Sequence, residues 1–226
     1  MKPIAGFDFD GVCRDESRSY QRCKRETVTH FDPSRRSPTS QEMAGSMAHS
    51  NNDWVGTQWI LEGRGVYRDL DTITEHFQDL YLGKERDFSG YIQNEPWLVD
   101  IKLLAELAKK FHIVVISSAP KEEIKYAARK NEAIDYIDLI LGMGDCEGKA
   151  DGAEQVLRKF GAETMWFCDD REPSLRDVAS NPNVKPYGIL PPRYQDGLAE
   201  KLKRAGAVDV FNDVNEYIKF LSAIKK

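Results

Sequence analysis

The sequence predicts an α/β fold, with a Rossmann-like core of parallel strands and an inserted all-helical cap domain. Three observations support this prediction. Short apolar runs alternate with amphipathic segments through most of the chain, which is typical of a parallel sheet covered by helices. The alternation stops between residues 14 and 96, where no good strand pattern occurs. The 226 residues, 41% hydrophobic and 31% charged, are enough for a packed core with a smaller insertion.

The core elements are predicted from hydrophobic periodicity. The first strand covers residues 3–8, an apolar run that ends in an aspartate. Further strands are expected at residues 112–116, 137–141, 165–168, 187–190 and 208–211. Helices are expected at residues 102–110, about 120–130, 151–160, 173–179, 195–204 and 214–223. Pro120 suits the first turn of a helix, and Gly161 is a typical helix stop.

The insertion is predicted to contain three helices. These are Ser17–Thr29, Asp53–Leu61 and Thr72–Leu82. Thr72 and Glu75 have the spacing of a capping box at the start of the third. The polar stretch Asp32–Asn52 is too long for a loop inside a compact domain, which favours a separate inserted domain. The predicted domains are residues 1–13 and 97–226 for the core and residues 14–96 for the cap.

Composition limits the partners and the location. The net charge is −5 and no long basic run occurs, so no nucleic-acid partner is expected. No stretch of about 18 apolar residues occurs, so no membrane span is expected. The first residues lack the apolar region of a signal peptide, and the four cysteines form no C-x-x-C pair. We therefore expect a cytoplasmic protein with reduced thiols, and its oligomeric state stays open.

The first chemical motif is Asp8-Phe9-Asp10-Gly11 at the end of the first strand. Gly11 permits the chain to turn after Asp8, so both carboxylates can approach one site. Ligands of parallel α/β sheets bind at the carboxyl ends of the strands. The alternative is a turn with capping aspartates.

Two weaker signals follow along the chain. Ser117 and Ser118 end the strand at residues 112–116, where a hydroxyl can bond a phosphate oxygen or cap the next helix. Lys149 precedes a helix, and its ammonium suits a phosphoryl group. Most lysines at such positions are simply solvated.

The last motif is Asp169-Asp170, after the strand at residues 165–168. Adjacent carboxylates repel each other unless a cation or hydrogen bonds compensate. Mg²⁺ prefers oxygen ligands of this kind. The alternative is an acidic loop that caps a helix.

Taken together, the four motifs resemble those of the haloacid dehalogenase superfamily of hydrolases, and the insertion resembles the helical cap of its phosphoglycolate-phosphatase-like branch. The resemblance implies that Asp8 is the nucleophile and Asp10 the general acid/base. It also implies that Ser117 and Lys149 bind the phosphoryl group, and Ser118 is a further candidate substrate-binding residue. It implies a Mg²⁺ ion held by Asp8, by the backbone carbonyl of Asp10, and by Asp169 and Asp170.

Some residues depart from the family pattern. Val12 stands where Thr is common, Cys168 where Gly usually precedes the metal acid, and Arg171 and Glu172 follow the acid pair in place of small residues. Which of the two acids ligates the metal directly is therefore open, although Asp169 aligns with the first acid of the motif.

The resemblance implies a phosphatase that hydrolyses a small phosphorylated metabolite, a sugar or organic-acid phosphomonoester, through an aspartyl-phosphate. A dehalogenase would not need Asp10, because it has no leaving alkoxide to protonate. A phosphomutase of the same fold and a non-enzymatic phosphate-binding regulatory module are the remaining alternatives. The substrate itself is not identified by the sequence.

The cap is expected to act as a lid that selects the substrate. Asn52, at the junction of a polar loop and a helix start, is the candidate substrate-binding residue. Helix capping by Asn52 is the competing interpretation.

Overall fold

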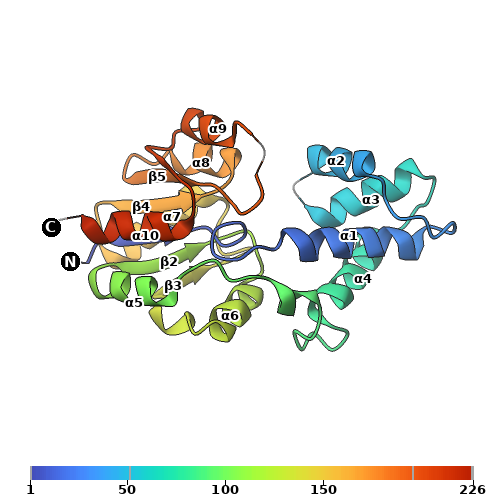
Figure 1. Cartoon of the computed structure of the whole chain (residues 1–226), viewed down its shortest axis with the longest axis horizontal. Coiled ribbons are helices and arrows are strands. Elements are labelled where there is room, and N and C mark those ends of the chain that lie inside the picture. The colour runs from blue at the N-terminus through green and yellow to red at the C-terminus, as the bar shows by residue number, and fades with distance from the viewer. Residues whose placement is uncertain (1, 51, 195, 225–226) are drawn as a thin grey trace. The chain divides into compact units, whose positions relative to one another are not determined.

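The computed structural model describes residues 2–50, 52–194 and 196–224, and the chain divides into two compact units (Figure 1). The core unit comprises Met1–Asp15 and Pro96–Lys226, and the helical unit comprises Glu16–Glu95. No helix among the described residues is both long and apolar enough to cross a membrane.

The core unit is built on one parallel sheet, as the sequence predicts. In the described residues its strands are β1 (Ile4–Phe7), β2 (His112–Ile116), β3 (Leu139–Leu141), β4 (Met165–Asp169), β5 (Val184–Ile189) and β6 (Val210–Phe211). Their order across the sheet is β3-β2-β1-β4-β5-β6. Phe7 of the central strand is in register with Val115 on one side and Cys168 on the other. The acidic residues that follow β1 and β4 therefore emerge at the same edge of the sheet.

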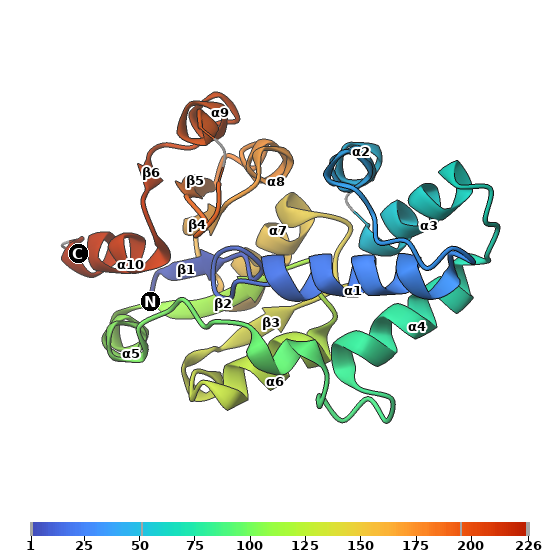
Figure 2. The same ribbon diagram turned by 45° about the vertical axis from the view of Figure 1, so that its right-hand side comes forward.

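Helices cover both faces of this sheet (Figure 2). They are α5 (Ile101–Lys110), α6 (Lys121–Lys130), α7 (Lys149–Phe160), α8 (Glu172–Val178), α9 (Leu198–Arg204) and α10 (Val214–Ala223), with a short 3₁₀ helix at Ile134–Tyr136. Side chains alternate between faces along a strand. Accordingly, Ala5 and Phe7 pack with α5, α6 and α10, whereas Ile4 packs with α7, α8 and α9. This two-sided burial explains why the strands are apolar runs without alternation.

Several predicted boundaries in the core differ from the observed ones. The third strand is shorter than predicted and the fifth begins three residues earlier. Pro120 is the residue before α6 rather than part of its first turn. Gly161 has the left-handed backbone expected of a helix stop, with φ of 63°. Gln195, predicted to begin α9, lies outside the described residues.

The helical unit contains α1 (Ser17–Phe31), α2 (Ser40–His49), α3 (Asp53–Gly63), α4 (Leu70–Leu82) and a 3₁₀ helix at Tyr91–Asn94. The prediction of three helices in the insertion missed α2, which lies within the polar stretch Asp32–Asn52. Thr39 and Glu42 form a complete capping box at its start. The capping box predicted at Thr72 was also wrong. Asp69 caps α4 instead, by accepting a hydrogen bond from the backbone N–H of Thr72.

Candidate active site

Asp8 follows β1 directly and is held in place by its backbone. Its N–H donates to the carbonyl of Cys168 on β4 at 2.9 Å, and the Cys13 thiol donates to its carbonyl at 3.2 Å. The loop then turns at Gly11, whose φ is +76°. A Cβ on Gly11 would also collide with the carboxylate of Asp170. A residue without a side chain is therefore required here.

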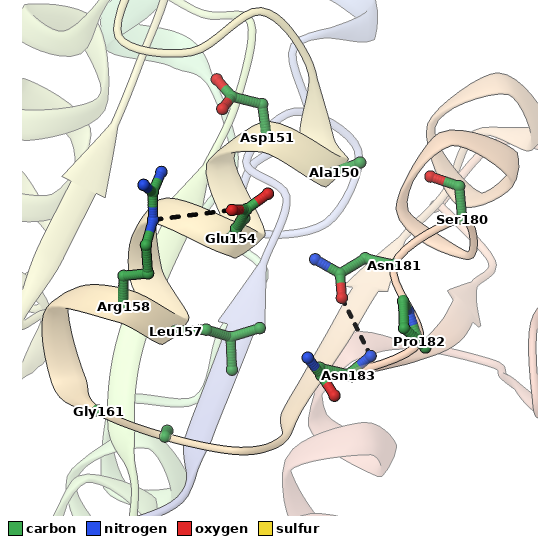
Figure 3. Close-up of a pocket in the computed structure, with 11 residues that line it drawn as sticks. Ala150, Asp151, Glu154, Leu157, Arg158, Gly161, Ser180, Asn181, Pro182 and Asn183 are labelled. Atoms are coloured by element: carbon green, nitrogen blue, oxygen red, sulfur yellow. Dashed lines mark hydrogen bonds and ion pairs between the residues drawn. The ribbon is translucent and has the colours of Figure 1, made fainter.

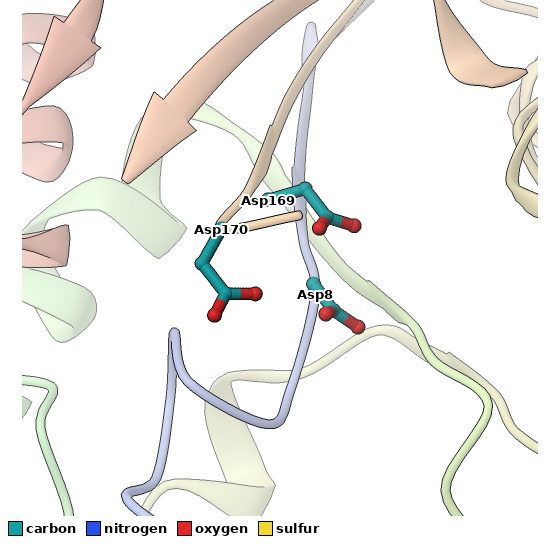
Figure 4. A group of neighbouring side chains, drawn as sticks. All are labelled: Asp8, Asp169 and Asp170. Atoms are coloured by element: carbon teal, nitrogen blue, oxygen red, sulfur yellow. The ribbon is translucent and has the colours of Figure 1, made fainter. Parts of the chain in front are cut away.

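Three carboxylates converge at this edge of the sheet (Figure 4). Asp8 comes from the end of β1, and Asp169 and Asp170 come from the end of β4. One oxygen from each lies within 4.8 Å of the others. Asp8 is 6% exposed and Asp169 is fully buried. Burying several carboxylates together is costly unless a positive charge accompanies them.

The electrostatics of Asp169 show the same demand for a cation. Burial and the charge of Asp8 raise the pKa of the Asp169 carboxyl to about 7, although Lys149 opposes the shift. Its Oδ1 accepts a hydrogen bond from the N–H of Arg171 at 2.9 Å. Among the described residues its buried Oδ2 has no hydrogen-bond partner, and the Lys149 ammonium is 3.5 Å away. A set of converging acidic oxygens that includes this Oδ2 fits a hard divalent cation such as Mg²⁺.

Lys149, the first residue of α7, reaches into this cluster. Its ammonium donates to Asp8 Oδ1 at 2.5 Å and to the carbonyl of Ile116, and lies 3.5 Å from Asp169 Oδ2. Burial lowers the pKa of Lys149, but the charges of Asp8 and Asp169 outweigh burial and raise it above its ordinary value. Lys149 therefore stays charged and offsets part of the negative charge of the carboxylates.

Ser117 lies at the carboxyl end of β2, the neighbour of β1 in the sheet. It is buried, and its hydroxyl oxygen accepts a hydrogen bond from the N–H of Ala119 at 3.1 Å. The hydroxyl thus shapes the turn before α6. Ser118, the next residue of the turn, is exposed.

Asp10 has a partner that the sequence did not indicate. Oδ1 of Asp10 accepts a hydrogen bond from Nε of Arg14 at 2.5 Å. Arg14 is 1% exposed and also pairs with Glu123 of α6 at 3.4 Å. The sequence indicates Arg14 only as the boundary of the predicted cap. A single arginine in a polar loop has no pattern from which its burial could be predicted.

Asn52 belongs to the helical unit, where it is the N-cap of α3. Its side-chain oxygen accepts hydrogen bonds from the N–H groups of Trp54 at 2.9 Å and Val55 at 3.2 Å. The described hydrogen bonds of the Asn52 side chain are thus those of a helix cap.

A surface groove of about 720 Å³ lies elsewhere in the core unit (Figure 3). One wall is α7, where Glu154 and Arg158 pair at 3.9 Å, and the other includes Asn181 and Asn183. These asparagines precede β5, whereas Asp169 ends its neighbour β4. The groove thus extends along α7, and none of the residues that line it belongs to the carboxylate cluster.

Comparison with known proteins gives matches in structure only. A provisionally named beta-phosphoglucomutase from Thermotoga maritima has a TM-score of 0.75 and 17% identity, with 99% of this chain and 100% of that chain covered. A predicted phosphoglycolate phosphatase from Haemophilus somnus has a TM-score of 0.75 and 13% identity, with 97% of each chain covered. A haloacid dehalogenase-like hydrolase from Streptococcus pneumoniae has a TM-score of 0.71 and 15% identity, with 97% of this chain and 98% of that chain covered.

Neither a protein-family model nor a curated protein sequence matches the chain. The structural matches extend over nearly the whole length of both chains, so they include the helical unit as well as the sheet. The chain therefore has the fold of the haloacid dehalogenase superfamily, the family that its four motifs resemble.

Proposed function

We propose that this protein is a Mg²⁺-dependent phosphatase that hydrolyses a small phosphomonoester with Asp8 as the nucleophile. The observation that carries the proposal is the convergence of Asp8, Asp169 and Asp170 within 4.8 Å, with the ammonium of Lys149 on Asp8. This arrangement supplies a nucleophile, metal ligands and a fixed positive charge at one edge of the sheet.

In the first half-reaction, a carboxylate oxygen of Asp8 attacks phosphorus. The new O–P bond forms as the bond to the leaving oxygen breaks, and the electron pair goes to that oxygen. Asp10 donates a proton to it, so the alcohol leaves in neutral form. The product on the protein is an aspartyl-phosphate.

In the second half-reaction, Asp10 takes a proton from a water molecule that attacks the same phosphorus. The bond between phosphorus and the Asp8 oxygen breaks, which restores Asp8 and releases inorganic phosphate. Asp8, Asp169, Asp170 and the carbonyl of Asp10 would hold Mg²⁺, which would offset the repulsion between the Asp8 carboxylate and the phosphate dianion. Lys149, Ser117 and Ser118 hold the non-bridging oxygens.

The helical unit is the proposed lid over this chemistry, and Asn52 is its candidate substrate contact. The two chain segments that connect the units, at residues 13–15 and 96–98, are joined to each other by backbone hydrogen bonds. Asp15 N–H donates to the carbonyl of Pro96, and Leu98 N–H donates to the carbonyl of Cys13, both at 2.9 Å. Two adjacent connecting segments of this kind are suited to a hinge. Closure of a lid would exclude water from the reacting groups. A cytoplasmic location and a small-molecule partner complete the proposal.

A panel of sugar and organic-acid phosphates tests this function. Phosphate release is measured with Mg²⁺, with EDTA, and with EDTA followed by excess Mg²⁺. The proposal expects release that EDTA abolishes and Mg²⁺ restores. Release that persists unchanged in EDTA would exclude the metal-dependent mechanism.

A phosphomutase is the second candidate, because one structural neighbour carries that provisional name. A mutase would return the phosphoryl group from Asp8 to a sugar hydroxyl instead of passing it to water. Product analysis with sugar phosphates separates the two, since a mutase yields an isomeric sugar phosphate and a phosphatase yields free phosphate.

A further inference from the structure

Arg14 is a charged side chain enclosed in the core unit. It is 1% exposed and is among the largest fully buried side chains of the described residues. A charge is kept inside a protein only where other groups compensate it. Its partners therefore indicate what it does.

The guanidinium is fixed on three sides. Its Nε donates to Oδ1 of Asp10 at 2.5 Å, its Nη2 pairs with Oε2 of Glu123 at 3.4 Å, and its Cζ lies 4.8 Å from the ring centroid of Phe9. Glu123 is itself 2% exposed and belongs to α6. A guanidinium group held by these contacts has little freedom to move.

The backbone of Arg14 is equally constrained. Its N–H donates to the carbonyl of Phe9 at 3.1 Å, and its carbonyl accepts from the N–H of Gly11 at 2.9 Å. These bonds close the loop that carries Asp10. Arg14 therefore holds both the backbone of that loop and the side chain within it.

Asp10 is the more exposed of the two carboxylates that follow β1. Its side chain is 26% exposed, whereas that of Asp8 is 8% exposed. An exposed aspartate side chain can adopt several rotamers, and a general acid must lie within hydrogen-bond reach of the leaving oxygen. The bond from Arg14 selects one orientation.

We propose that Arg14 is a positioning residue that fixes the Asp10 carboxyl for proton transfer, and that Glu123 on α6 fixes Arg14 in turn. The proposal rests on the phosphatase function given above. It differs from that function in assigning part of the rate to two residues outside the four motifs.

A double-mutant cycle tests it. The variants are Arg14→Met, Asp10→Asn and the two combined, and the readout is kcat for phenyl phosphate and for p-nitrophenyl phosphate. The two substrates have similar shape, but phenolate is the more basic leaving group and depends more on a proton donor. Misplacing a catalytic group by about 1 Å can cost about 10²-fold. Arg14→Met should therefore lower kcat for phenyl phosphate by about that factor, and by less for the nitrophenyl ester.

The cycle separates positioning from general damage to the fold. If Arg14 acts through Asp10, Arg14→Met has no further effect in the Asp10→Asn background. Losses that multiply, or equal losses for the two esters, would overturn the proposal. Glu123→Gln should reproduce the pattern of Arg14→Met more weakly.

Loss of Arg14 leaves Glu123 buried without that cation, so the single variant could fail to fold. The combination of Arg14→Met with Glu123→Leu removes both charges and keeps apolar volume. The same kinetic pattern is expected from it. Lys24→Met is the matched control, because Lys24 is a buried cation of the helical unit paired with Asp53 at 2.6 Å. It should leave the ratio between the two esters unchanged, and a changed ratio would overturn the assignment to Arg14.

Failure of the proposed function has a different signature. If the wild-type protein released no phosphate, or if Asp8→Asn released it at the wild-type rate, the phosphatase mechanism would fail. A crystal structure of the Arg14→Met protein then tests positioning by itself. The proposal expects the Asp10 carboxyl to leave its observed orientation, and an unchanged orientation would refute it.

Discussion

The ammonium of Lys149 donates a hydrogen bond to Oδ1 of Asp8 at 2.5 Å, although the two residues are 141 positions apart in the sequence. The same ammonium lies 3.5 Å from Asp169. In the proposed mechanism, Lys149 orients Asp8 before the reaction and stabilises negative charge on the phosphoryl group during it.

Replacing Lys149 with Met should therefore lower phosphate release sharply. Removing one donor that stabilises transition-state charge typically costs about 10²–10³-fold in kcat. Lys121→Met is a suitable control, because Lys121 also lies at a helix start of the core unit but pairs with Asp145 at 2.8 Å. Steady-state assays of both variants test the assignment, and similar losses in the two would contradict it.

Asp169 should matter for metal affinity more than for folding. Its buried Oδ2 has no hydrogen-bond partner among the described residues, so Asp169→Asn removes a proposed metal ligand and leaves the bond from Arg171 possible. Even residues that only support metal ligands change affinity about 10–100-fold. The Mg²⁺ concentration for half-maximal activity should rise at least about tenfold in Asp169→Asn. A larger rise in Asp170→Asn would make Asp170 the direct ligand.

Asn52→Ala separates the two roles considered for this residue. Loss of an N-cap side chain costs about 0.5–2 kcal/mol of unfolding free energy, and we expect a loss in that range because Asn52 caps α3. If Asn52 also contacts the substrate, Asn52→Ala should lower kcat/KM much more for the best natural substrate than for a small aryl phosphate. Equal changes for both substrates would leave only the capping role.

The ion pair between Arg64 and Glu42 should make the stability of the helical unit depend on pH. Arg64 donates to both Glu42 oxygens, at 2.7 and 2.8 Å. The bond from Arg64 is the main cause that lowers the pKa of the Glu42 carboxyl from 4.5 to about 2. A lowered pKa stabilises the fold above pH 4.5, and that contribution is lost as the pH falls toward 2.

The free energy of unfolding of Glu42→Gln at neutral pH should therefore be lower than that of the wild-type protein. The expected difference is about 2 kcal/mol, the contribution of a hydrogen bond to a charged group. The difference from the wild-type protein should shrink between pH 4.5 and 2, where the wild-type carboxylate takes up its proton. Urea denaturation at several pH values measures this. Glu26→Gln is the control, because Glu26 pairs with Arg22 on the surface. A difference that does not change with pH would contradict the role of the charge.

The sequence predicted those helices and strands whose buried residues follow a clear hydrophobic pattern. The bounds of β2 and α10 match the prediction, because both elements are bordered by clear changes from apolar to polar residues. The helix α2 was missed because its residues are mainly small and polar, with Met43 and Ser46 its buried members. Its capping box, Thr39 with Glu42, was the signal that could have revealed it.

Some contacts of the candidate site could likewise be predicted from the sequence, and others could not. Asp8, Asp169 and Asp170 could be brought together in advance, since the carboxyl ends of neighbouring parallel strands meet at one edge. The pairing of Arg14 with Glu123 could not, because it joins residues 109 positions apart. No periodic pattern in either segment marks that contact.

The central claim is that Asp8 carries the phosphoryl group during the reaction. The most direct measurement is rapid acid quenching of the protein during turnover of a good substrate, followed by peptide mass spectrometry. The account predicts one phosphoryl group on the peptide that contains Asp8, and none in the Asp8→Asn protein, which should also release no phosphate. Phosphate release by Asp8→Asn at the wild-type rate, or a phosphoryl group on another residue, would contradict it.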